Sequence, residues 1–232
     1  SGSFLANYAY CVSLLIANIA IAISAVGYAV ALFGLNTTPF ETCLLTIVVL
    51  WICTVLNFKG AKITGLISNF TAWGVIIPVA GISVIGWFWF NPETYISAWN
   101  PHDLPTFDAI SASISMTLWS FLGLESACAN SESVDNPEKN VPKAVLGATI
   151  GVAVIYILST NVAAGIVDNA ELVKSTAPFG LVFATMFNGT VGQIVMGLMI
   201  LSCSGSLLSW QFTIARVFKS SADEGYFPKW FS

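Results

Sequence analysis

The chain has 232 residues, of which 56% are hydrophobic and only 9% are charged. Soluble domains carry about 25% charged residues, so this composition excludes a soluble domain and indicates a membrane protein with several spans. The formal net charge of −4 lies mostly in the predicted loops, and we therefore expect no nucleic-acid partner.

Six stretches of the sequence are long and apolar enough to cross a bilayer as helices. A helix needs about 20 apolar residues to cross a hydrocarbon core of about 30 Å. Runs such as IANIAIAISAVGYAVALFG are apolar on every side, whereas barrel strands alternate polar and apolar residues, so helices are favoured. We predict an all-α membrane protein with one transmembrane domain over residues 1–232, and spans near 6–34, 42–58, 66–90, 109–130, 144–167 and 190–215.

The basic residues set the expected orientation of these spans. Seven of the eight lysine and arginine residues follow the second, fourth or sixth span, and Lys174 follows the fifth. Basic residues collect at the cytoplasmic ends of membrane helices, so both ends of the chain are expected inside the cell. Because the sequence begins SGSFLANY without a methionine, we also expect it to be a piece of a longer protein.

The cysteine and histidine residues give no basis for a metal site. His102 is the single histidine, and it lies in a predicted outer loop. We therefore expect no metal, no cofactor and no histidine-based catalytic set. The cysteines show no CxxC spacing and fall inside the predicted spans, where free thiols are expected. They are Cys11, Cys43, Cys53, Cys128 and Cys203.

Glu125 is the one acidic residue predicted inside a span, in the run TLWSFLGLESACAN. A carboxylate in the hydrocarbon core is costly unless it faces a cavity or a partner, so Glu125 is a candidate for a functional site. The alternative is that Glu125 lies near the inner end of its span and is solvated by the following loop. An uncharged run still separates it from the next charge, Glu132, which favours the functional interpretation.

Trp119 lies six residues before Glu125, which places the two side chains on different faces of an unbroken helix. They face one cavity only if the helix breaks between them. Gly123 tolerates unusual dihedral angles, and a break there would free the backbone groups from Ser120 to Leu124 to bind a ligand. The alternative for Gly123 is close packing against another helix.

The first span carries small and polar residues along one face. Tyr10, Ser13, Ala17 and Ser24 recur at helical spacing, with Asn18 beside them. Such a face suits either ligand contact or hydrogen-bonded packing between helices. Packing is the favoured interpretation for Ser13 and Ser24. For Tyr10 and Asn18, ligand contact and packing are equally favoured.

Trp210 stands in the sixth span after the run ILSCSGSLLS, which is rich in serine. Small residues let helix backbones approach closely, so Trp210 is either a packing residue or an aromatic wall for a cation. An aromatic face attracts a desolvated ammonium group by about 2 kcal/mol. Together with Trp119 and Glu125, Trp210 predicts a cavity that selects cations.

The segment ARVFKSSADEGYFPK after the sixth span has an amphipathic pattern. We predict a short amphipathic helix that lies at the inner membrane surface and ends at Gly225 and Pro228. The basic residues Arg216 and Lys219 agree with a cytoplasmic position.

Several segments resemble one group of carriers, and together they cover the chain from end to end. They are VSLLIANIAIAISAVGY, VLWICTV, GWFWF, TLWSFLGLESACAN, NPEKNVP, STNVAAGIV, STAPFG and GSLLSWQFTIARVFKSSADEGYFPK. The chain is similar to the basic amino acid and polyamine antiporters of the amino acid, polyamine and organocation transporter superfamily. Putrescine/ornithine antiporters resemble it more than lysine/cadaverine or arginine/agmatine antiporters, which share W-x-F-x-G-x-E-S but differ in the sixth span.

The resemblance implies a carrier of about twelve helices built from inverted repeats, of which this chain holds helices three to eight. Residues 109–130 would form helix six, a discontinuous helix. In the family pattern the glutamate binds the substrate amine, and the tryptophan that begins the pattern stacks over the substrate. These positions are Glu125 and Trp119 in this chain.

The resemblance also assigns roles to four residues outside that pattern. Tyr10 and Trp210 match residues that restrict the inner path of the substrate. Asn18 matches an asparagine that contacts substrate, and Tyr8 matches a tyrosine that is sensitive to substitution. All four are expected to lie along the substrate path.

The activity implied by the resemblance is the exchange of putrescine for ornithine across the cytoplasmic membrane, with protons coupled to putrescine uptake as a second mode. The bilayer and a second copy of the chain are the other partners that the resemblance allows. Another pair of basic amino acid and amine is the alternative, and a cation channel is less favoured because few spans offer polar faces. We do not expect the protein to be an enzyme, since the predicted spans hold no histidine or aspartate that could serve as the base for a nucleophile or as a metal ligand.

Overall fold

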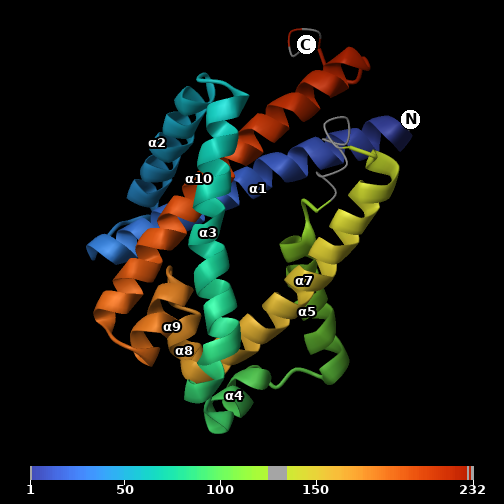
Figure 1. Ribbon diagram of the computed structural model, residues 1–232. Helices are drawn as coiled ribbons and strands as arrows, with labels where there is room; N and C mark the ends of the chain where they lie inside the picture. The colour runs from blue at the N-terminus through green and yellow to red at the C-terminus, as the bar shows by residue number, and fades with distance from the viewer. Residues whose placement is uncertain (1, 125–134, 229, 231–232) are drawn as a thin grey trace. The chain divides into compact units, whose positions relative to one another are not determined.

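A computed structural model describes residues 2–124, 135–228 and 230 of the chain (Figure 1). The described residues form helices and contain no strand, which confirms the predicted all-α class. The α-helices are α1 (Gly2–Phe33), α2 (Pro39–Asn57), α3 (Ala61–Ile85), α4 (Pro92–Trp99), α5 (Thr106–Phe121), α7 (Pro137–Ile166), α8 (Asn169–Leu172), α9 (Pro178–Met186) and α10 (Gly189–Asp223), and η1 (Gly86–Trp89) is a 3₁₀ helix.

Five helices in the described part of the chain have the length and apolar composition of membrane spans. They are α1, α2, α3 together with η1, α7 and α10, and they coincide with five of the predicted spans. The region of the predicted fourth span holds α5, which has 16 residues and is shorter than the length of about 20 that a crossing needs. Residues 125–130 of that span lie outside the described residues.

The helices group into two compact units. The first unit contains residues up to 78 together with residues 175–232, and the second contains residues 79–174. In the first unit α10 packs against α1, α2 and α9, and α1 also packs against α2. In the second unit α7 packs against η1 and α4.

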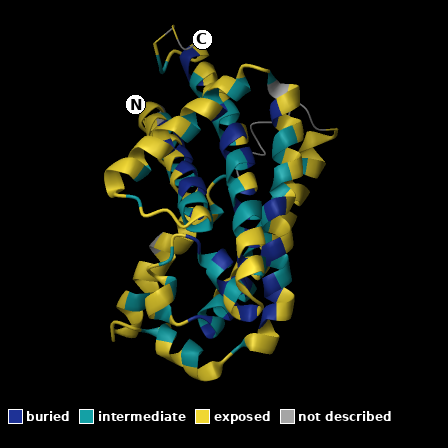
Figure 2. Ribbon diagram, turned by 90° about the vertical axis from the view of Figure 1, so that its left-hand side faces the viewer, coloured by how far each residue is buried: buried dark blue, intermediate teal, exposed yellow. Residues whose placement is uncertain are grey.

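The core of the first unit lies where α1 and α2 meet α10. Ala22, Cys53, Leu207 and Leu208 are buried there in one contiguous cluster. Buried residues recur at intervals of three or four along α1, so one face of this helix is packed (Figure 2). The opposite face exposes large apolar side chains, as expected for a helix that contacts lipid.

Small residues bring α3 and α10 close together in the first unit. The hydroxyl of Ser68 donates to the backbone oxygen of Gly205 at 2.8 Å. A Cβ atom on Gly74 would lie 2.6 Å from the backbone oxygen of Leu198, closer than side chains pack. The approach of these two helices therefore depends on glycine, as in many helix interfaces within membranes.

Replacing Gly74 with alanine is expected to destabilise the protein, because the added methyl group meets a backbone atom that cannot rotate away. We expect a loss of about 1–3 kcal/mol, measured as a lower melting temperature of the purified protein in detergent. Gly81→Ala on the same helix is the matched control, since nothing lies within 4 Å of a Cβ atom there. Equal melting temperatures for the two variants would contradict this account of the interface.

Hydrogen bonds and aromatic rings hold η1 and α4 against α7 in the second unit. The amide of Asn91 donates to the backbone oxygen of Gly165 at 2.9 Å. The hydroxyl of Tyr95 donates to Oδ1 of Asn161, and its ring centroid lies 5.3 Å from that of Phe90. Aromatic side chains with a polar tip are typical of the membrane surface, which suits this short, partly exposed segment.

Four cysteines lie in the described residues, and all four are free thiols, as predicted. Cys11 and Cys53 are buried, Cys43 is exposed, and Cys203 is partly buried. Cys128 lies outside the described residues.

The residues after 215 are helical as predicted, but they form the end of the long helix α10 and not a short helix of their own. α10 continues without interruption to Asp223, where Lys219 pairs with Asp223 at 3.2 Å on the helix surface. No glycine or proline interrupts residues 212–224, so helical hydrogen bonding propagates beyond the apolar stretch. The chain turns at Gly225, with φ of +79°, as the sequence predicted for this position.

Candidate functional site

The backbone changes direction just before Glu125, which itself lies outside the described residues. α5 ends at Phe121, and Leu122 takes an extended conformation with φ of −65° and ψ of +137°. Gly123 has φ of +105°, a conformation that residues with a side chain rarely adopt. The α-helix therefore ends at Phe121, before Glu125, and the role of this segment in substrate binding stays a prediction.

Tyr156 of α7 holds the end of α5 within the second unit. Its hydroxyl donates to the backbone oxygen of Ser120 at 3.2 Å, and its ring meets Phe121 edge-on at 5.6 Å between centroids. A carbonyl freed at a helix end needs such a donor. Trp119 lies in the same last turn of α5, and 43% of its surface is exposed. The predicted contacts of Trp119 and Ser120 with a ligand stay predictions.

Tyr8 and Tyr10 lie near the start of α1 in the first unit. Tyr8 is exposed and stacks on Phe4, with ring centroids 6.2 Å apart. Tyr10 is half-buried, and its backbone oxygen accepts a hydrogen bond from the hydroxyl of Ser13 at 2.8 Å. The hydroxyl of Ser24 also donates to a carbonyl of its own helix. Both serine hydroxyls therefore bond within α1, and packing of these serines against another helix stays a prediction.

Asn18 lies on the packed face of α1, and only 8% of its surface is exposed. No described residue donates a hydrogen bond to its Oδ1 atom. A buried acceptor without a donor costs about 1–3 kcal/mol, so this oxygen is expected to find a partner in the working protein. An ammonium group is a suitable partner, because it offers three donors and no acceptor.

Trp210 lines a cavity of about 450 Å³ between α1, α3 and α10 in the first unit. None of the eleven side chains that line it is charged, and its polar groups are hydroxyls, one thiol and the indole of Trp210. Tyr8, Tyr10 and Asn18 are not among the lining residues. The lining consists of Ile21, Ser24, Ser68, Ala72, Val75, Met199, Ser202, Cys203, Ser206, Ser209 and Trp210.

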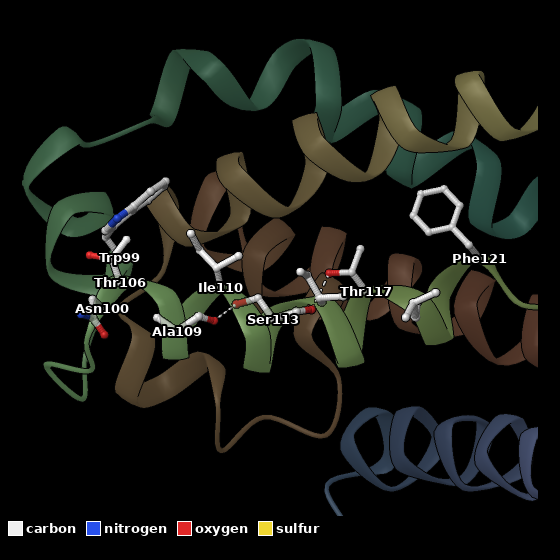
Figure 3. Close-up of a pocket in the computed structure, with 10 residues that line it drawn as sticks. Trp99, Asn100, Thr106, Ala109, Ile110, Ser113, Thr117 and Phe121 are labelled. Carbon is white, nitrogen blue, oxygen red and sulfur yellow. Dashed lines mark hydrogen bonds between the residues drawn. The ribbon is translucent and has the colours of Figure 1, made fainter.

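A second cavity, of about 750 Å³, runs along α5 in the second unit (Figure 3). Ser113 and Thr117 line it, but each donates its hydroxyl at 2.8 Å to a carbonyl oxygen of α5 itself. Trp119 is not among the residues that line this cavity. Its largely apolar lining suits hydrocarbon chains better than a charged ligand.

The model of the amino acid permease family matches residues 2–232, almost the whole chain. The chain belongs to the amino acid permease family. This result confirms the family resemblance that the sequence segments indicated.

Two relatives match this permease over its full length. It is 68% identical over 231 residues to the putrescine transporter PotE of Haemophilus influenzae, and 67% identical over 232 residues to that of Escherichia coli strain K12. It is also 31% identical over 214 residues, 92% of the chain, to the cadaverine/lysine antiporter of Escherichia coli strain K12. The matched regions are 53%, 53% and 48% of those proteins, so the chain spans about half the length of the curated relatives it matches.

The sequence did not reveal how two amide side chains of the permease meet in the first unit. Nδ2 of Asn57 donates to Oε1 of Gln211 at 3.2 Å, although 154 positions separate these residues in the chain. The sequence does show that each amide lies in an apolar helix, and polar residues in such helices usually face a partner or a cavity. The identity of the partner depends on the packing of α2 against α10, which residue spacing does not encode.

Proposed function

We propose that the full-length permease exchanges putrescine for ornithine across the cytoplasmic membrane. The observation that carries this proposal is the 67–68% identity to two proteins named putrescine transporters, against 31% to a cadaverine/lysine antiporter. Ornithine enters the proposal through the family resemblance of the sequence segments. Both putrescine and ornithine carry ammonium groups at neutral pH, so one site for a cation serves both.

Glu125 is the residue that we assign to an ammonium group of the substrate. A carboxylate in a membrane helix is stabilised when it pairs with a cation, and a charge-assisted hydrogen bond adds to this pairing. The turn at Gly123 supports the assignment, because a helix end leaves backbone carbonyls that attract positive charge.

Asn18 and Trp210 are assigned to the same substrate. The buried Oδ1 atom of Asn18 has no donor among the described residues and can accept a hydrogen bond from an ammonium group. Trp210 faces an uncharged cavity, where attraction between a cation and an aromatic ring is worth about 2 kcal/mol. Tyr8, Tyr10 and Trp119 are assigned to the substrate path on the family resemblance alone.

Exchange follows from the cost of an unpaired charge. With substrate bound, the carboxylate of Glu125 is paired, but in the empty carrier it stands uncompensated in a medium of low polarity. The empty carrier therefore changes slowly between its inward and outward states, and exit of one cation is coupled to entry of another. Protonation of Glu125 removes the charge, which gives proton-coupled putrescine uptake as a second mode.

The five apolar helices make the described part of the chain a multi-pass membrane protein. We propose that both ends of this chain face the cytoplasm, because seven of the eight basic residues fall on one side of the predicted spans. We propose that this membrane is the cytoplasmic membrane, which is the inner membrane in bacteria that have two. A homodimer is part of the proposal on the family resemblance alone.

Competition against labelled putrescine, in proteoliposomes that contain the full-length permease, tests the proposed substrates. Unlabelled putrescine and ornithine are expected to compete at concentrations about tenfold lower than cadaverine or lysine. A tenfold difference corresponds to about 1.4 kcal/mol, which one additional methylene group in a fitted pocket accounts for. Stronger competition by cadaverine and lysine would favour the alternative pair instead.

A further inference from the structure

Two amide side chains join α2 to α10 beside the cavity of the first unit. Nε2 of Gln211 donates to the backbone oxygen of Leu50 at 3.2 Å and to Oγ1 of Thr54 at 3.3 Å. Nδ2 of Asn57 donates to Oε1 of Gln211 and to the backbone oxygen of Leu208, both at 3.2 Å. Every hydrogen-bonding atom of the Gln211 amide thus has a partner on α2.

The same cluster includes α3. The hydroxyl of Thr64 donates to Oδ1 of Asn57 at 2.9 Å, and Thr64 is 4% exposed. Both amides are therefore satisfied by protein atoms, and the cluster contains no charged side chain. A fully satisfied, partly buried polar cluster favours one arrangement of the helices that it joins, because another arrangement leaves its polar atoms without these partners.

Trp210 is the neighbour of Gln211 on α10, and the two side chains leave the helix about 100° apart. The cluster holds Gln211 toward α2, while Trp210 lines the cavity between α1, α3 and α10. The bond from Asn57 to the backbone of Leu208 fixes the same turn of α10 along its axis. Rotation of α10 that moved Trp210 out of the cavity would break these hydrogen bonds.

We propose that Asn57 and Gln211 are positioning residues that hold the ring of Trp210 in the cavity wall and thereby set the affinity for the amine substrate. Neither residue lines the cavity, so both act through Trp210. This inference rests on the proposed function for its consequence in transport, but the placement of the Trp210 ring does not depend on any substrate.

The first test therefore measures the Trp210 ring itself. Trp210 is one of eight tryptophans in these 232 residues. Its fluorescence in the full-length permease is obtained by subtracting the spectrum of Trp210→Phe from that of the parent protein, with and without Gln211→Leu. Gln211→Leu is expected to shift this difference spectrum. The matched control is Gln193→Leu, the same substitution at an exposed position of α10, which is expected to leave it unchanged. An unchanged difference spectrum in Gln211→Leu would overturn the proposal.

The second test measures putrescine exchange in proteoliposomes. Gln211→Leu is expected to raise the KM for putrescine by about 3- to 20-fold, the range expected for one or two hydrogen bonds between membrane helices, with kcat changed by less than about twofold. In a Trp210→Leu background the same substitution is expected to change KM by less than about twofold. An equal effect in both backgrounds would show that Gln211 does not act through Trp210.

A milder variant keeps both tests decisive where Gln211→Leu does not fold. Thr54→Val removes one acceptor of the Gln211 amide at nearly constant volume, and a smaller shift of the Trp210 spectrum in the same direction is expected. A spectral shift without any putrescine exchange by the wild-type protein would contradict the proposed function and leave the positioning role supported. Normal putrescine exchange by the wild type, without a spectral shift in the variant, would support the proposed function and contradict the positioning role.

Discussion

Glu125→Gln is expected to abolish the exchange of labelled putrescine for internal ornithine in proteoliposomes. The substitution keeps the size of the side chain and removes the charge that we propose to pair with the ammonium group. Removing one partner of a buried ion pair costs about 3–5 kcal/mol, which corresponds to a loss of about 10²- to 10⁴-fold in kcat/KM. Initial rates of putrescine entry over a range of concentrations measure this loss.

Glu138→Gln is the matched control, because Glu138 is exposed in the first turn of α7. Exposed charges contribute little, so this variant is expected to exchange putrescine within about twofold of the wild type. Exchange at the wild-type rate by Glu125→Gln would support the other interpretation of this residue, a carboxylate solvated by the loop that follows it.

Trp210→Leu is expected to weaken putrescine binding by about 30-fold, the equivalent of the 2 kcal/mol or so that an aromatic ring contributes to a desolvated cation. Leucine fills part of the volume but has no aromatic face. Trp210→Tyr keeps an aromatic face and is expected to lose less than Trp210→Leu. Equilibrium binding of labelled putrescine to the purified full-length protein measures both.

Trp51→Leu controls for the loss of a tryptophan as such, because Trp51 lies on α2 with 66% of its surface exposed. Its putrescine affinity is expected to equal that of the wild type. Equal losses in Trp210→Leu and Trp210→Tyr would mean that the volume of the indole matters and its aromatic face does not.

The helices were predictable because long apolar runs leave few alternatives in a bilayer, where each backbone polar group must be bonded within the segment. The ends of the helices were harder to predict. α10 extends to Asp223 because no residue stops it, whereas apolar character alone ends near residue 215. α5 ends at Phe121 inside a run that hydropathy treats as continuous, and only Gly123 gave a local signal for this end.

The sequence singles out candidate site residues one by one, but it does not give their arrangement in space. An isolated carboxylate at Glu125 and a tryptophan among serines at Trp210 are unusual in a membrane helix, so composition alone singles them out. Burial of Asn18 without a donor, and the bond between Asn57 and Gln211, depend on which helix faces meet. That information arises from packing between segments far apart in the chain, and residue spacing within one helix does not contain it.

Coupled exchange is the central claim, and entry of labelled putrescine into proteoliposomes with and without internal ornithine tests it most directly. With equal pH on both sides, so that no proton gradient drives uptake, the full-length permease is expected to accumulate label only when ornithine is inside, and to do so against the putrescine gradient. The proposed reason is that an empty carrier with an unpaired Glu125 changes state slowly. Label that enters equally fast into empty proteoliposomes, and only until the two sides are equal, would contradict exchange and indicate a channel or a uniporter.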